Sequence, residues 1–344
     1  MTSPIPPRAP LSTPLPTRPL GTSGLEITTV GLGTWAIGGG GWLYGWGPQD
    51  DEQSLATMRR AVELGINWFD TAGVYGHGHS EEVCGRFLRE VSDDRRPLVF
   101  TKCGPVWDER EPFKDEPSDL APGTIRRQCE DSLRRLGVER LDLLQFHWPD
   151  DAGVAIEDSW AEMARLQDAG KVRYAGVSNF DPELLARCEA IRHVDSLQQE
   201  FSLIARDTAG KELPWVREHG TGLLCYSPIG SGQLTDGFTI ERVRELSEED
   251  WRRREFVEPA LSRNLALRDA LRPIAARHGA SVMSVALAWL LAWDGVTAAI
   301  VGARRPEQID GWIDAAALRL RPDDLDEIAR AAQTTRAGEG PDRP

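Results

Sequence analysis

The sequence alternates short apolar segments with longer segments of helical periodicity along almost its whole length. Short apolar runs bounded by turn signals are typical of buried strands, and strands that alternate with helices predict a parallel sheet. Eight such units predict an α/β protein, a (β/α)8 TIM barrel. The expected strands are 30–35, 67–70, 98–102, 141–146, 172–177, 196–201, 222–227 and 296–301.

The segments between these strands carry the end signals of helices. A glycine, which commonly closes a helix, directly follows the periodic segments 53–64, 124–136 and 156–169. Further helices are expected at 182–191, as a helical pair around 261–293, and at 322–332, where an extra C-terminal helix packs outside the barrel. A small N-terminal hairpin is expected around the turn Thr22-Ser23-Gly24.

Composition narrows the class of protein. The net charge of −14 argues against a general nucleic-acid surface, because phosphate contacts need clustered Lys and Arg. Five scattered cysteines without a CxxC motif indicate reduced thiols, and no signal peptide or membrane-spanning segment is expected, so we predict a cytoplasmic protein. The predicted organisation is a disordered Pro-rich leader over 1–18, one barrel domain over 19–335 and a flexible tail over 336–344. The sequence carries no feature that sets an oligomeric state.

Three consecutive expected strands end on charged or titratable residues. Asp70 ends the strand 67–70, Lys102 ends the next, and His147 directly follows the third. Tyr75 lies in the loop just beyond Asp70. The carboxyl ends of parallel barrel strands meet at one face, where barrels carry their chemistry.

These four residues together suit proton donation to a carbonyl oxygen while a hydride reaches the carbonyl carbon. Tyrosine is a weak acid with an ordinary pKa of about 10, and a neighbouring Lys102 is expected to lower the pKa of Tyr75. Asp70 is expected to hold Lys102 charged, and His147 to hydrogen-bond the carbonyl oxygen. Each residue alone has an ordinary structural interpretation. Four at correlated strand ends favour an active site.

Three motifs extend this interpretation. The stretch from Phe69 to Gly76, followed by Gly78-His79-Ser80-Glu81, resembles the first motif of the aldo-keto reductase family. Thr101-Lys102 and Phe146-His147-Trp148-Pro149 are further matches in the family's order, and the resemblance covers roughly residues 18 to 335. It implies NADPH-dependent reduction of a small aldehyde or ketone to an alcohol. Tyr75 would be the general acid, Asp70 and Lys102 its tuning pair, and His147 the residue that orients the carbonyl.

The resemblance also implies how the cofactor is held. Ser178, Asn179 and Gln198 would bind the nicotinamide carboxamide, which offers both a donor and an acceptor, and Tyr226 would stack on the ring. The segment from Ser227 to Leu234 would follow the pyrophosphate, and Arg304 would bind the 2′-phosphate with a fork of hydrogen bonds. NADPH is therefore expected, with NADH as the alternative. The full predicted cofactor set is Gly33, Thr34, Trp35, Ser178, Asn179, Gln198, Tyr226, Ser227, Gly230, Gly232, Leu234, Gly302, Arg304 and Gln308.

Several alternatives stay open at this point. Gly33 also fits a barrel strand that needs close backbone approach, and the loop containing Arg304 also fits a solvated basic loop. Trp312 stands where family members often have an asparagine that contacts adenine, and Phe201 stands in place of a tyrosine. Trp35, Trp107 and Trp148 either line the site or pack in the core.

Two other functions are alternatives. His77-Gly78-His79 is an HxH pair, as in metal-dependent hydrolases, but it lies in a loop, so no metal site is expected. A nucleotide-binding regulatory barrel without turnover would keep the fold and lose the catalytic set.

Overall fold

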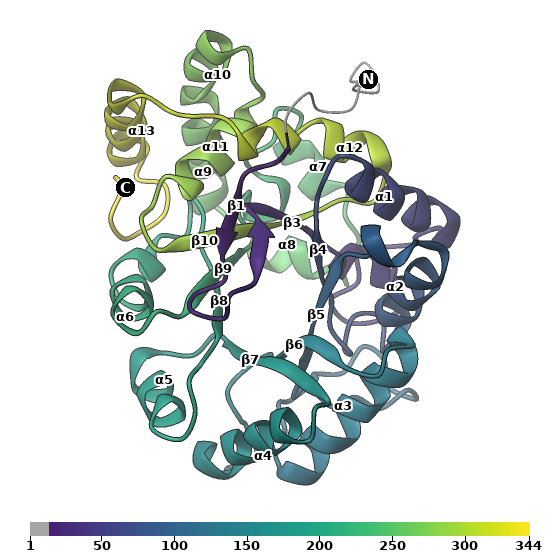
Figure 1. Cartoon of the computed structure of the whole chain (residues 1–344). Helices are drawn as coiled ribbons and strands as arrows, with labels where there is room; N and C mark the ends of the chain where they lie inside the picture. The colour runs from purple at the N-terminus through teal and green to yellow at the C-terminus, as the bar shows by residue number, and fades with distance from the viewer. Residues whose placement is uncertain (1–13) are drawn as a thin grey trace.

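The chain folds into a closed barrel of parallel strands, which confirms the predicted (β/α)8 class (Figure 1). The computed structural model describes residues 14–344. Successive strands are neighbours in the barrel, and β10 closes the ring by pairing with both β9 and β3. The barrel strands are β3 Val30–Gly33, β4 Trp68–Asp70, β5 Leu98–Cys103, β6 Leu141–Phe146, β7 Val172–Ser178, β8 Ser196–Glu200, β9 Gly222–Tyr226 and β10 Val296–Gly302.

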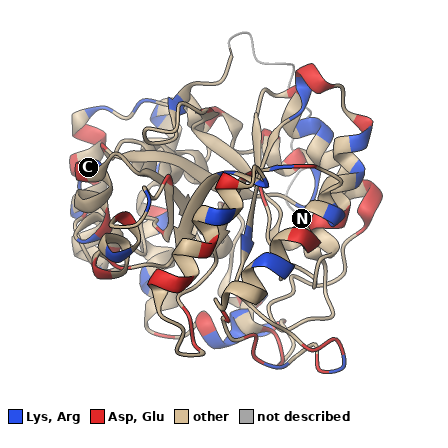
Figure 2. Ribbon diagram, turned by 60° about the horizontal axis from the view of Figure 1, so that its bottom comes forward, with Lys and Arg blue, Asp and Glu red and all other residues tan. Residues whose placement is uncertain are grey.

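Helices form the outer layer, so the strands are buried on both faces and are apolar along most of their length. Lys, Arg, Asp and Glu lie mainly on these helices and on the loops (Figure 2). The helices are α1 Asp51–Glu63, α2 His79–Glu90, α3 Pro122–Leu136, α4 Ile156–Asp168, α5 Pro182–Glu189, α6 Glu212–His219, α7 Ile240–Arg244, α8 Trp251–Glu255, α9 Ala260–Ala270, α10 Arg272–His278, α11 Val282–Leu291, α12 Pro306–Asp310 and α13 Pro322–Thr335.

Two elements differ from their predicted form. The expected helical pair around 261–293 is three helices, α9, α10 and α11. A proline stands in the first turn of α10, and Gly279 ends that helix in the left-handed conformation. The first barrel strand stops at Gly33 rather than at residue 35, because Trp35–Gly38 forms a short 3₁₀ turn. The periodicity of a short apolar run does not reveal such a turn.

The predicted hairpin is present and covers one end of the barrel. It consists of β1 Thr17–Pro19 and β2 Glu26–Thr28, which pair antiparallel. Its apolar residues Leu20 and Ile27 are fully buried in a cluster with barrel residues such as Trp68. Leu15 is also buried, so ordered structure begins before the predicted domain boundary at residue 19. Residues 1–13 of the predicted leader lie outside the described part of the chain.

The C-terminal segment, predicted as a flexible tail, contacts the loop after β8. Arg206, in the loop after β8, is buried, and its guanidinium donates hydrogen bonds to the carbonyl oxygens of Ala337, Gly338 and Gly340. The backbone N–H of Arg206 also donates to the carbonyl of Glu339. Because a buried guanidinium needs acceptors, these carbonyls fix residues 337–340 against the barrel.

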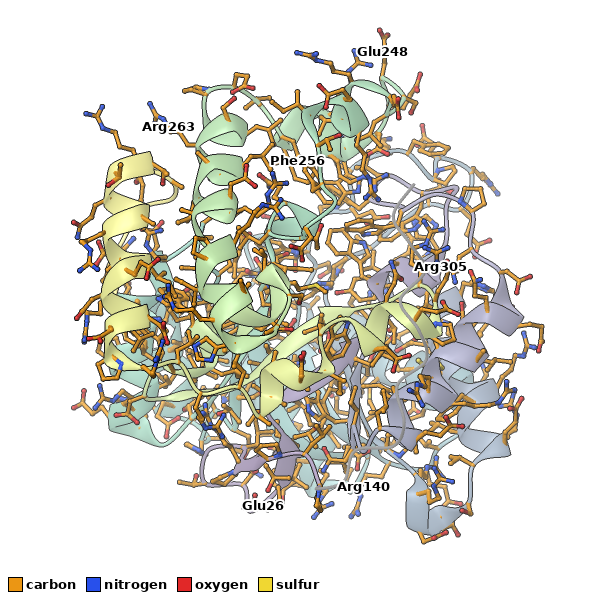
Figure 3. The ribbon with its side chains drawn as sticks, turned by 90° about the horizontal axis from the view of Figure 1, so that it is seen from above. Glu26, Arg140, Glu248, Phe256, Arg263 and Arg305 are labelled. Atoms are coloured by element: carbon orange, nitrogen blue, oxygen red, sulfur yellow. The ribbon has the colours of Figure 1, made fainter. Side chains whose placement is uncertain are left out.

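The two ends of the barrel carry different structures. In the side view of Figure 3, Glu26 of the hairpin lies at one end, while Glu248 and Phe256 of the long segment after β9 lie at the other.

No single helix among residues 14–344 is long and apolar enough to cross a membrane, although the bent pair Ala260–His278 and Val282–Leu291 reaches the required length and composition together. Most residues of α11 are buried against the barrel.

We predict that Gly31→Ala destabilises the barrel. A Cβ at Gly31 would lie 2.3 Å from the indole of Trp68, which is buried and donates from Nε1 to the carbonyl of Thr28. Overpacking of this kind costs about 1–3 kcal/mol, which urea unfolding measures. Gly123→Ala is the control, because a Cβ there meets nothing within 4 Å. Equal stability of the two variants would contradict this account of the core.

Candidate active site

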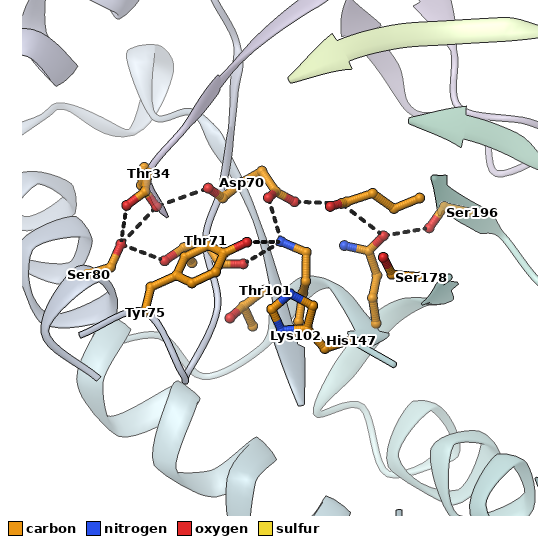
Figure 4. A network of polar contacts seen from close by, with 12 residues as sticks. Thr34, Asp70, Thr71, Tyr75, Ser80, Thr101, Lys102, His147, Ser178 and Ser196 are labelled. Carbon is orange, nitrogen blue, oxygen red and sulfur yellow. Dashed lines mark hydrogen bonds and ion pairs between the residues drawn. The ribbon is translucent and has the colours of Figure 1, made fainter. Parts of the chain in front are cut away.

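The structure brings the four predicted strand-end residues together at one end of the barrel (Figure 4). Asp70 is the last residue of β4, Lys102 lies near the end of β5, and His147 directly follows β6. Tyr75 lies in the loop between β4 and α2. Asp70 and Lys102 are buried, whereas Tyr75 and His147 are partly exposed. The site therefore has a buried ion pair beneath two side chains that can meet a ligand.

Asp70 and Lys102 form the predicted buried pair. Lys102 Nζ lies 2.5 Å from Asp70 Oδ1, and the two side chains are 0% and 3% exposed. Lys102 Nζ also donates to the carbonyl of Thr71 at 2.9 Å, and Gln198 Nε2 donates to Asp70 Oδ2 at 2.9 Å. Buried charges are stable only when they are paired and hydrogen-bonded, and these additional contacts meet that requirement.

Tyr75 contacts the pair, but its acidity differs from the expectation. Its hydroxyl oxygen lies 3.4 Å from Lys102 Nζ. Burial, followed by the negative charge of Asp70, raises the pKa of Tyr75 well above its ordinary value, so the predicted lowering by Lys102 is wrong for this state. Burial also lowers the pKa of Lys102, against the opposing effect of Asp70. Tyr75 therefore keeps its proton at neutral pH.

His147, which follows β6, approaches Tyr75, which follows β4, across the end of β5. The two rings meet edge to face, with centroids 5.6 Å apart. Desolvation, with a smaller contribution from the positive charge of Lys102, lowers the pKa of His147 well below its ordinary value. The imidazole is therefore neutral at pH 7. Its Nδ1 is buried without a hydrogen-bond partner among the described residues. A neutral imidazole can donate one hydrogen bond to a carbonyl oxygen.

Of the residues expected around the nicotinamide, Ser178 ends β7 and Asn179 directly follows it. Gln198 lies within β8, and Tyr226 ends β9. Asn179 has a left-handed φ of 62°, and its amide donates to the carbonyl of His147 at 2.9 Å. Asn179 Oδ1 accepts from the Tyr226 hydroxyl at 2.8 Å, and the Ser178 hydroxyl accepts from Asn179 Nδ2 at 3.1 Å. Gln198 reaches Asp70, so this group and the catalytic pair form one continuous network.

The segment after β9 has the backbone conformation of a tight turn. Ser227, Gly230 and Gly232 all have positive φ angles, of 48°, 56° and 98°. The turn is closed by its own backbone hydrogen bonds, in which the N–H groups of Gly230, Gly232 and Leu234 donate to carbonyls of the same segment. Leu234 is fully buried and anchors the end of the segment.

The three residues expected at the end of β3 do not present free side-chain donors to a cofactor. The hydroxyl of the buried Thr34 donates to the carbonyl of Asp70 and accepts from Ser80. Trp35 donates from Nε1 to the carbonyl of Tyr44. Gly33 is buried, and a Cβ there would meet Ile300 at 2.8 Å, which supports the alternative of close packing within the barrel.

Arg304 has an unexpected set of partners. Its guanidinium donates to Gln49 Oε1 at 2.8 Å and to the carbonyls of Trp46 and Pro48. Arg304 therefore holds the loop 46–49 after β3. The carboxamide oxygen of Gln308 accepts from the backbone N–H groups of Arg304 and Arg305. Gly302 ends β10 and is exposed.

Arg304 also lies among other arginines. Burial, and then the charges of Arg252, Arg305 and Arg242, lower the pKa of its guanidinium. Arg252 and Arg242 come from the segment between β9 and β10, 52 and 62 residues before Arg304 in the sequence. Residues 242, 252, 304 and 305 form an arginine cluster, in which Arg252 is also paired with Asp250 at 2.5 Å. The guanidinium group is a common partner of phosphate.

Aromatic residues from separate loops meet beside Tyr75. Trp35 stacks on Trp251 with centroids 5.1 Å apart, and Trp35 and Trp42 each lie 6.3 Å from the Tyr75 ring. Trp107 stacks on His77 at 5.1 Å. Trp35 and Trp107 are thus part of the wall beside the site, and Trp148 is 48% exposed next to His147.

Two members of this wall, Trp42 and Trp251, were not predicted. Trp42 lies in a loop and Trp251 begins the short helix α8, and no periodicity in the sequence indicates that either side chain points toward Tyr75. Trp312 is fully buried and cannot take the place of an asparagine at an adenine ring.

The HxH pair does not form a metal site. His77 Nε2 contacts Glu116 Oε1 at 2.7 Å, and His79 Nε2 contacts Asp51 Oδ1 at 2.8 Å, so the two imidazoles point to different carboxylates. Residues 14–344 contain no cluster of three or more His, Cys, Asp or Glu that could hold a metal ion.

The fold and this strand-end constellation define a barrel oxidoreductase. The sequence matches the family model described as "Aldo/keto reductase family" over residues 29–333. The chain belongs to the aldo-keto reductase family, and it is accordingly an NAD(P)H-dependent oxidoreductase that acts on carbonyl compounds.

Characterised relatives and solved structures are similar over most of the chain. "Aldo-keto reductase YhdN" of Bacillus subtilis is 32% identical, covering 91% of this chain and 92% of that protein. "NADH-specific methylglyoxal reductase" of Escherichia coli is 30% identical, covering 90% and 95%. The structure of the glycerol dehydrogenase AKR11B4 from Gluconobacter oxydans has a TM-score of 0.83 and 34% identity, covering 94% of this chain and 97% of that chain.

The lowered pKa of His147 predicts a pH dependence of stability. The unfolded chain protonates this residue near its ordinary pKa of about 6.5, while the folded protein does not. Below that pH the unfolded state binds the additional proton, so the contribution of His147 to stability is present above about pH 6.5 and is lost as the pH falls.

Urea unfolding at pH 7.5 and 5.5, for wild type and His147→Gln, measures this contribution. One proton accounts for at most about 1.4 kcal/mol per pH unit. We expect wild type to lose more stability on acidification than the variant. Equal losses of stability in wild type and variant would show that His147 is protonated to the same extent in the folded and unfolded states.

Proposed function

We propose that the protein reduces an aldehyde or ketone to an alcohol, with Tyr75 as the general acid and NADPH as the preferred cofactor. The observation that carries the proposal is the position of Lys102 Nζ, which contacts Asp70 Oδ1 at 2.5 Å and the Tyr75 hydroxyl at 3.4 Å. A protonated tyrosine beside a buried cation can release its proton when negative charge develops on a neighbouring oxygen.

The proposed roles follow from the protonation states. Tyr75 donates its hydroxyl proton to the carbonyl oxygen of the substrate. The ammonium of Lys102 stabilises the tyrosinate that this leaves, because opposite charges attract strongly in a buried site. Asp70 holds Lys102 in place, and the neutral imidazole of His147 donates a hydrogen bond to the same carbonyl oxygen. When bound, a reduced nicotinamide supplies the hydride to the carbonyl carbon.

Polar atoms that the protein leaves unused fit a nicotinamide carboxamide. Among residues 14–344 the Ser178 hydroxyl accepts from Asn179 but donates to no protein group, and both protein contacts of the Gln198 amide use Nε2 rather than Oε1. A free donor and a free acceptor beside the catalytic pair match the two functions of the carboxamide. In the proposed arrangement Tyr226 stacks on the ring, and residues 227–234 hold the pyrophosphate.

The arginine cluster supports NADPH over NADH. Arg304 and Arg305 follow β10, where barrels commonly bind phosphate, and Arg252 and Arg242 contribute further positive charge. The Escherichia coli relative is named as NADH-specific, so relatives do not share one cofactor preference. The proposed preference for NADPH therefore rests on Arg304 and the arginines beside it.

Removal of the proposed proton donor tests the mechanism. Tyr75→Phe should retain the fold and bind NADPH like wild type, since only the hydroxyl is lost. Turnover should fall by about 10²–10⁴-fold, the usual contribution of general acid catalysis. The rate of NADPH consumption with a panel of aldehydes and ketones measures this turnover. Near-normal activity in the variant would refute the assignment of Tyr75 as the general acid.

The cofactor preference is tested at Arg304. Arg304→Ala should weaken NADPH binding by roughly ten- to a hundredfold, because charge-assisted hydrogen bonds contribute about 1.5–3 kcal/mol. NADH affinity should barely change, as titration by quenching of tryptophan fluorescence will measure.

Gln49→Ala is the matched control, because it removes a loop partner of Arg304 and leaves the guanidinium. Equal losses for both cofactors in Arg304→Ala, reproduced by Gln49→Ala, would mean that Arg304 acts only by holding the loop 46–49.

A further inference from the structure

A second buried carboxylate, Glu81, lies behind the catalytic pair. Glu81 belongs to the first turn of α2 and is 0% exposed. Its Oε1 accepts a hydrogen bond from the Thr101 hydroxyl at 2.6 Å, and its Oε2 lies 2.9 Å from Arg135 Nη1 of α3. Glu81 therefore connects α2, β5 and α3 at one buried point.

Glu81 connects α2, which directly follows the loop carrying Tyr75, to β5, which carries Lys102. The carbonyl of Tyr75 accepts from the backbone N–H of Ser80, the residue directly before Glu81. Thr101, which donates to Glu81, directly precedes Lys102 on β5. The contact between the Tyr75 hydroxyl and Lys102 Nζ spans the same two elements, so the bridge through Glu81 runs parallel to it.

Arg135 supports the loop that carries Tyr75 from below. A Cβ at Gly78, which has a φ of 103°, would lie 2.5 Å from Arg135 Nε, and a Cβ at Gly73 would lie 3.6 Å from Arg135 Nη1. Both ends of the loop 73–78 thus rest on the guanidinium. Because the Arg135 side chain is only 17% exposed, it also compensates the buried charge of Glu81.

We propose that Glu81, held in place by Arg135, is a positioning residue that sets the separation between the Tyr75 hydroxyl and Lys102 Nζ. Glu81 does not touch the substrate or the cofactor. Its effect reaches the reaction through Ser80 and Thr101. The proposal rests on the proposed roles of Tyr75 and Lys102.

Glu81→Gln tests the proposal, and Glu162→Gln is a matched control. Glu162 is also a buried carboxylate, held by Arg126 of α3 and Arg165, but it lies on α4. Both variants should lower the melting temperature. Only Glu81→Gln should lower kcat, on the order of ten- to a hundredfold, because a small misplacement of a proton donor has that effect.

Three further measurements separate positioning from a general loss of structure. In Glu81→Gln the Kd of NADPH and the KM of the aldehyde should be little changed, and the solvent isotope effect on kcat should rise as proton transfer becomes slower. A crystal structure of the variant should show a longer separation between the Tyr75 hydroxyl and Lys102 Nζ. Thr101→Val, which removes one contact of Glu81, should cause a smaller loss of kcat.

Equal kcat values for Glu81→Gln and Glu162→Gln would overturn the proposal, as would a loss confined to NADPH binding. If Glu81→Gln does not fold, Thr101→Val decides, and unchanged kcat in that variant would overturn the proposal. Failure of the proposed function can be told apart from failure of the Glu81 proposal. If the proposed function is wrong, wild type will be inactive or Tyr75→Phe fully active.

Discussion

The buried ion pair between Asp70 and Lys102 is the interaction on which the site depends. Both side chains are withdrawn from water, and each is stable there only because the other is present. Gln198 and the carbonyl of Thr71 satisfy their remaining hydrogen-bonding groups. Three strands and the first turn beyond β4 must therefore keep their register, or a charge is left uncompensated. The geometry needed for proton transfer is thus a condition for a stable barrel end.

The same barrel end combines groups whose pKa values move in opposite directions. Burial raises the pKa of Tyr75 and lowers those of Lys102 and His147. In each case burial stabilises the neutral form of the side chain relative to its charged form. This suits a site that exchanges a single proton with an uncharged carbonyl. Desolvation thus outweighs the neighbouring charges, and a ligand that brings developing negative charge would reverse that balance at Tyr75.

The barrel, and the meeting of Asp70, Lys102 and His147 at one of its ends, could be predicted because these residues lie at the ends of regular elements. Asp70 and Lys102 end buried strands and His147 directly follows one, and parallel strands of one barrel end at the same face. The acidity of Tyr75 could not be predicted, since it depends on burial that only the folded loop determines. The partners of Arg304 and the stack of Trp35 on Trp251 could not be predicted either, because loops and short helical turns from distant parts of the sequence bring these residues together. The contacts of the C-terminal segment could not be predicted, because backbone carbonyls, which every sequence has, make them.

The hydrogen bonds of Arg206 also set an order of events during synthesis. This buried guanidinium lies in the loop after β8, yet Ala337, Gly338 and Gly340 supply three of its acceptors. Ala337 follows Arg206 by 131 residues, so a chain still growing on the ribosome offers Arg206 none of these partners. The loop after β8, whose Ile204 packs against Gly230, reaches its final form only once residue 340 has been added. The segment 227–234, which is proposed to hold the pyrophosphate, is therefore completed after most of the barrel has been translated.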